Sequence, residues 1–85
     1  MKCYIYRSSK QEEMYLYLRE RDAFKPVPEV LLSRFGKAVF VMELDLASRT
    51  KLAREDINHV RTALQERGFH LQLPPTIEAH LDDGD

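Results

Sequence analysis

The sequence predicts an α+β fold in which a sheet of about four strands packs with two helices. Three observations lead to this fold class. Four runs of residues alternate between apolar and polar side chains, two segments have apolar side chains at helical spacing, and proline or glycine separates several of them. The predicted order is strand, strand, helix, strand, helix, strand, which suits a sandwich of sheet and helices. The length of 85 residues allows one modest core and is too short for two ordinary domains.

Two short strands are predicted at the start of the chain. Residues 3–7 and residues 14–18 each alternate, and the polar segment 8–12 between them suits a turn, so the pair is expected to form a β-hairpin. The turn lacks the Asn-Gly or Asp-Gly pair that is typical of a two-residue connection. We therefore expect a longer loop.

Two segments predict helices. Residues 30–35 form a short amphipathic segment that follows a proline at position 28 and ends at Gly36. A longer helix is expected from about residue 55 to residue 67, with Gly68 closing it. Its apolar stripe consists of Ile57, Val60 and Leu64.

The last two strands are predicted at residues 38–46 and 69–73. The first of these has apolar side chains at every even position, which is the strongest strand signal in the chain. Because Val39 and Val41 are also apolar, we expect its first half to be covered on both faces, with Phe40 central to the core. Two prolines end the run at 69–73.

The end of the chain is predicted to be peripheral. Ile77 and Leu81 are four residues apart and could form one helical turn, whereas residues 82–85 are an acidic tail that is expected to fray. The predicted domain therefore spans residues 1–81. Residues 76–85 carry four acidic side chains and no Lys or Arg, which leaves 13 basic and 10 acidic side chains in the rest of the chain. This mild excess does not indicate a nucleic-acid-binding protein.

Cysteine usage and the N-terminal sequence indicate a cytoplasmic protein. Cys3 is the single cysteine, so no internal disulfide can form, and small secreted domains usually contain several. We see no apolar segment long enough for a signal peptide or a membrane span. The sequence has neither a CxxC motif nor paired histidines at a metal-ligand spacing, and we expect no metal and no cofactor.

Four stretches of the chain resemble the YcgL-type domain of proteobacteria. They are MKCYIYRSSKQEEMYLYL, VPEVLLSRFGKAVFVMELDL, SRTKLAREDINHVRTAL and GFHLQLPP, and the similarity runs from Met1 to about Leu81. The resemblance implies a small cytoplasmic domain with an α/β/α-type sandwich. It implies no activity, cofactor or catalytic residue, because none is established for the family.

No set of residues indicates catalysis. Cys3 shares a strand face with Ile5 and is expected to be a buried structural thiol. The three histidines do not converge in the sequence, and a triad built from Ser8 or Ser9 with His70 has no support from spacing. We therefore predict that the protein is not an enzyme.

A basic connection precedes the second predicted helix. Arg49 and Lys51 lie just before a helix N-terminus, where backbone N–H groups favour anions, so a phosphate site is conceivable. No glycine-rich loop accompanies these residues. An ordinary solvated loop is the alternative interpretation.

The tyrosines suggest a binding surface. If strand alternation is continuous, Cys3, Ile5 and the even-numbered residues of 14–18 share one face of the sheet, and all four tyrosines share the other. Aromatic sheet faces flanked by cations can stack single-stranded bases. The alternative is that a helix covers this face. The candidate binding surface consists of Tyr4, Tyr6, Tyr15, Tyr17, Arg19, His70, Arg49 and Lys51.

Three functions remain open. The favoured one is a non-enzymatic accessory domain that binds another cytosolic protein. The second is single-stranded RNA binding through the tyrosine face. The third is a small-molecule-binding or anion-binding enzyme built around Arg49, Lys51 and His70.

Overall fold

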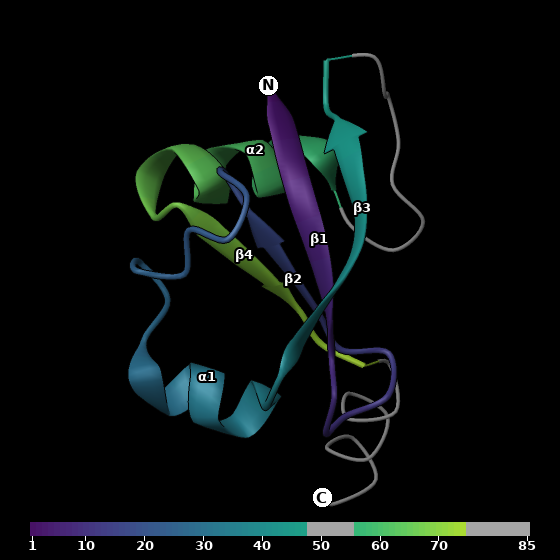
Figure 1. Cartoon of the computed structure of the whole chain (residues 1–85). Helices are drawn as coiled ribbons and strands as arrows, with labels where there is room; N and C mark the ends of the chain where they lie inside the picture. Colours follow the sequence, from purple (N-terminus) through teal and green to yellow (C-terminus); the bar gives the residue numbers. More distant parts are fainter. Residues whose placement is uncertain (48–55, 75–85) are drawn as a thin grey trace, which may run out of the picture.

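The computed structural model describes residues 1–47 and 56–74. Its six elements follow the predicted order, and the α+β fold class is confirmed. The strands form one antiparallel sheet with the spatial order β3-β1-β2-β4 (Figure 1). The elements are β1 (Lys2–Ser8), β2 (Tyr15–Leu18), α1 (Glu29–Phe35), β3 (Ala38–Asp45), α2 (Ile57–Glu66) and β4 (Phe69–Gln72).

Each face of the sheet carries its own apolar cluster. One face packs against α2, and the other packs against α1 and the loop that precedes it. The α2-side cluster comprises Cys3, Ile5, Tyr17, Leu44, Leu46, Val60 and Leu64. The α1-side cluster comprises Tyr6, Met14, Leu16, Leu18, Val27 and Phe35. Because the helices cover opposite faces, the protein has the three layers of an α/β/α sandwich.

A β-bulge in β3 changes which face its side chains occupy. Ile5 of β1 lies opposite Met42, but the next residue, Tyr6, lies opposite Phe40, so Val41 is an extra residue in the ladder. Even-numbered residues before the bulge therefore lie on the α1 side, where Ala38 packs against the α1-side cluster. Even-numbered residues after it lie on the α2 side, where Leu44 belongs to the α2-side cluster.

This bulge and the exposure of β3 correct two expectations. Strand 38–46 does not keep its even-numbered side chains on one face, because one inserted residue reverses the alternation. Its first half is not covered on both faces either, because Val41, whose burial that expectation required, is 45% exposed. Phe40 is 38% exposed and is not central to the core.

Both helices end close to their predicted bounds. Gly36 follows α1 with a φ of 76°, and a Cβ atom there would lie 2.6 Å from Ser9 Oγ, so both backbone and space require glycine. Helix α2 begins later than predicted because Asp56 is its N-cap: the Asp56 carboxylate accepts hydrogen bonds from the backbone N–H groups of Asn58 and His59.

Some predictions lie outside the described residues. They are the basic connection with Arg49 and Lys51, the helical turn at 77–81 and the acidic tail at 82–85.

Strand β4 ends at Gln72, one residue before its predicted end. Within residues 1–47 and 56–74, neither helix has the length and hydrophobicity needed to span a membrane.

Candidate functional site

The four tyrosines lie on two faces of the sheet, two on each. The hairpin register places Ile5 opposite Tyr17 and Tyr6 opposite Leu16, and directly opposed residues share a face. Tyr17 therefore lies in the α2-side cluster with Ile5, and Tyr6 lies in the α1-side cluster with Leu16. The prediction of a single tyrosine face is wrong, and the geometry on which base stacking depended is absent from the described sheet.

The hydroxyl groups of the two buried tyrosines are used within the fold. Tyr6 Oη donates a hydrogen bond to Asp22 Oδ1 at 2.9 Å and accepts one from the Asp22 backbone N–H at 2.8 Å. Asp22 has a positive φ of 60°, so these bonds hold a loop residue in a conformation that non-glycine residues rarely adopt. Tyr17 Oη donates to Gln72 Oε1 at 2.8 Å. Tyr4 and Tyr15 are partly buried against the two clusters.

The other predicted site residues do not join the tyrosines in one surface. Arg19 is exposed directly after β2, and its backbone N–H donates to the Gly68 carbonyl. His70 lies on β4 opposite Tyr17, with ring centroids 5.5 Å apart, and its ring is 6.0 Å from that of His59. Arg49 and Lys51 lie outside the described residues, so the predicted anion site has no described geometry.

The two candidate nucleophiles, Cys3 and Ser8, are buried. Cys3 is fully buried, as predicted, and burial raises the pKa of its thiol to about 11. A thiol with this pKa remains protonated near neutral pH and is a poor nucleophile. Ser8 is buried, and its Oγ donates to the Phe35 carbonyl while accepting from the backbone N–H groups of Lys10 and Gln11. No cluster of metal-ligating side chains occurs in the part of the chain that the structure describes.

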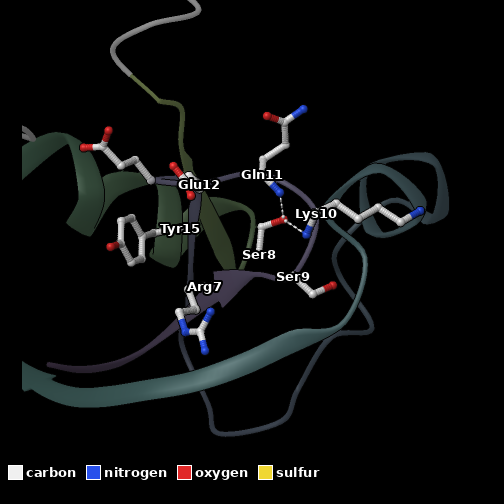
Figure 2. Close-up of a pocket in the computed structure, with 8 residues that line it drawn as sticks. Arg7, Ser8, Ser9, Lys10, Gln11, Glu12 and Tyr15 are labelled. Carbon is white, nitrogen blue, oxygen red and sulfur yellow. Dashed lines mark hydrogen bonds between the residues drawn. The ribbon is translucent and has the colours of Figure 1, made fainter.

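A small polar pocket lies at the β1–β2 turn. Its volume is about 350 Å³. Figure 2 shows Ser8 at its centre, bonded to the turn backbone, with the Lys10 side chain extending away from Arg7 and Tyr15. The lining residues are Arg7, Ser8, Ser9, Lys10, Gln11, Glu12, Glu13 and Tyr15. Because side chains of both charge signs line it and most are exposed, the pocket selects no single class of ligand.

The pocket turn is fastened to α1 and β3. Lys10 Nζ donates to the Ser33 carbonyl at 3.0 Å, and Ser9 Oγ accepts from the Lys37 backbone N–H at 2.7 Å. The Lys10 and Ser8 bonds satisfy carbonyl groups in the last turn of α1, where a cation is also favoured by the helix dipole. The principal role of these side chains is therefore to hold the hairpin, α1 and the start of β3 together.

The exposed edge of β3 is a surface that the sequence predictions missed. Phe40, Val41 and Met42 are consecutive apolar residues with exposed fractions of 38%, 45% and 38%. The Arg21 guanidinium lies 4.2 Å from the centre of the Phe40 ring, a cation–π contact on the α1 side of the sheet. The run of apolar residues was visible in the sequence, but it predicted burial. Strands that are buried on both faces have the same apolar composition as this exposed edge.

Comparisons with known proteins agree with the resemblance seen in the sequence. The YcgL domain matches residues 3–75 of the chain. The YcgL domain-containing protein PMI1171 of Proteus mirabilis is 49% identical over 82 residues, covering 96% of this chain and 84% of its own. A YcgL domain-containing protein of Serratia proteamaculans is 49% identical over 87 residues, covering 98% and 97%. PC1_1941 of Pectobacterium carotovorum is 50% identical over 82 residues, covering 96% of each chain. The chain therefore belongs to the YcgL domain family.

Proposed function

We propose that the protein is a non-enzymatic, cytoplasmic accessory domain that binds another protein through the edge of β3. One observation carries this proposal: Phe40, Val41 and Met42 are exposed together on an edge strand. Edge strands have backbone N–H and C=O groups without a partner strand on one side, and natural proteins usually shield them with charges or cover them. An edge whose centre is apolar is a surface suited to protein contact.

The length of β3 supports binding at this edge in preference to the opposite one. Strand β3 has eight residues, whereas β4, at the other edge, has four. An added strand gains affinity from main-chain hydrogen bonds and specificity from alternate side chains, so a longer edge offers more of both. In Figure 1, β3 runs from the end of α1 to the top of the sheet, and its upper part lies on the outer side of β1.

The surroundings of the candidate catalytic groups support a role without catalysis. The Cys3 thiol is buried and protonated, and the Ser8 hydroxyl is engaged by three backbone groups. A catalytic site needs a nucleophile, a base and a group that stabilises developing charge within reach of one another. The described side chains offer no such set, and a free Cys3 thiol suits a reducing compartment.

Site-specific photo-crosslinking in cells that naturally produce the protein tests the proposal. A photoreactive p-benzoylphenylalanine replaces Val41 in one variant and Gln65, an exposed residue of α2, in a control variant. We expect irradiation to produce a discrete protein adduct at position 41 and none at position 65. The absence of an adduct at position 41, or equal adducts at both positions, would contradict the proposal.

A further inference from the structure

We propose that His59 of α2 and His70 of β4 together bind a zinc ion. The site lies where α2 meets β4, and β4 is the edge of the sheet opposite β3. It is therefore separate from the surface of the proposed function, and each can be tested without the other.

The fold brings the two histidines together from different elements. Helix α2 ends at a turn around Gly68, and the chain then returns as β4 beside the helix (Figure 1). The His59 and His70 rings consequently face each other with their centres 6.0 Å apart and their planes at 56°. This proximity depends on the turn and on the packing of α2, which is why the spacing of the histidines in the sequence gave no metal signal.

The separation of the rings suits one zinc ion between them. Zinc in proteins is usually tetrahedral and binds imidazole nitrogen at about 2.0–2.1 Å. With bonds of this length, two imidazole rings on one tetrahedral zinc have their centres about 5–6 Å apart. The observed 6.0 Å lies at the upper end of this range. A small rotation of the exposed His59 side chain is enough to close the site.

The His70 ring is held in place by its neighbours. Strand pairing puts His70 opposite Tyr17, and the two rings meet edge-on at 77° with centres 5.5 Å apart. Tyr17 is buried, and its hydroxyl donates to Gln72 Oε1 at 2.8 Å. A ligand that is already positioned by packing loses little conformational freedom on binding. His70 therefore provides a fixed ligand, and His59 provides an accessible one.

The charges around His59 permit a cation. His59 lies in the first turn of α2, where the helix dipole by itself disfavours positive charge. Asp56 offsets this effect, because its carboxylate caps the helix and its Oδ1 atom lies 3.4 Å from the His59 backbone nitrogen. A negative charge is therefore present within one helical turn of the pair.

The pair provides two of the four ligands of a tetrahedral zinc. No group of three or more metal-ligating side chains occurs within residues 1–47 and 56–74, so the remaining positions are open to water. Each histidine binds through one ring nitrogen and can keep a hydrogen bond at the other. Such a site exchanges its ion, and we expect a dissociation constant in the micromolar range. Bound zinc links the first turn of α2 to β4.

Isothermal titration of zinc chloride into the whole chain tests the inference. We expect one zinc per chain for the native protein, and binding that is about 10–100-fold weaker in H59Q and in H70Q. H80Q is the matched control, because it removes the third histidine of the chain, and it should bind zinc like the native protein. Circular dichroism without zinc verifies that the variants fold. Since His59 is exposed, H59Q keeps the test valid if H70Q is destabilised.

Thermal melting and NMR give two further readouts. Zinc at about tenfold above its dissociation constant should raise the melting temperature of the native chain by about 5 °C or more, and should raise that of H59Q much less. The imidazole signals of His59 and His70 should shift together during the titration. Three results would overturn the inference: no binding below about 1 mM zinc, unchanged affinity in H59Q and H70Q, or equal losses in H59Q and H80Q.

Discussion

Strands β2 and β3 lie on either side of β1 and differ in what surrounds their side chains. Strand β2 has β1 on one side and β4 on the other, and Leu16 and Leu18 are fully buried beneath the α1 layer. Strand β3 pairs with β1 alone among the described strands, and the three residues at its centre are exposed. Position in the sheet, more than apolar content, therefore decides which strand has buried side chains and which has exposed ones.

The largest expected effect is at the buried centre. Leu16→Ala removes a fully buried side chain from the α1-side cluster, and we expect a loss of about 2–5 kcal/mol in the free energy of unfolding. Urea denaturation followed by circular dichroism measures the change. A loss below about 1 kcal/mol would show that the centre of the sheet is not where stability resides.

A smaller effect is expected at the residue that joins α1 to β3. Gly36→Ala places a Cβ atom 2.6 Å from Ser9 Oγ and 2.7 Å from Lys10 Cγ at a residue with φ of 76°. We expect a loss of about 1–3 kcal/mol, because the backbone becomes strained and the hairpin turn must shift. Gly68→Ala is a useful comparison, since its φ of 85° is also positive but its nearest contact, Pro26 Cγ at 3.0 Å, is looser. Equal melting temperatures for Gly36→Ala and the native chain would contradict the close approach.

Phe40→Ala should have a modest effect on stability. The ring is partly exposed and contacts the Tyr6 ring edge-on, with centroids 5.6 Å apart, in addition to the Arg21 guanidinium. Loss of these contacts is expected to reduce the free energy of unfolding by about 1–2 kcal/mol. A loss of about 3–5 kcal/mol, the range for a fully buried phenylalanine, would restore the expectation from sequence that Phe40 is central to the core.

The order and type of the elements could be predicted because each depends on local signals. Gly36 and Gly68 mark the ends of both helices, and period-2 alternation identified all four strands. The burial of Cys3 also followed from its place beside Ile5. These inferences need no knowledge of which strands are neighbours.

Which residues of neighbouring strands share a face of the sheet could not be predicted in the same way. In a three-layer fold both faces of the sheet are apolar, so hydrophobicity does not decide whether Ile5 shares a face with Leu16 or with Tyr17. The bulge at Val41 has no glycine or other local signal, yet it moves Phe40 and Met42 to different faces. The prediction of a single tyrosine surface was wrong because the sequence does not determine which faces neighbouring strands share. The β3 edge was missed because the bulge has no local signal and because edge and central strands can have the same composition.

The smallest effect on stability, and the clearest separation of binding from folding, is expected at Val41. Val41 is 45% exposed and is the extra residue of the bulge, so a lysine there can extend into solvent without displacing a core side chain. We expect Val41→Lys to change the free energy of unfolding by less than about 0.5 kcal/mol, as surface substitutions usually do. A lysine at the centre of an apolar edge discourages strand addition, so binding of a partner protein at the β3 edge should be lost. Denaturation of the purified variant measures stability, and photo-crosslinking from p-benzoylphenylalanine at position 42, an exposed neighbour, measures binding in cells. A variant that is strongly destabilised would place Val41 in the core, and one that is stable and still gives the crosslinked adduct would show that the contact lies elsewhere.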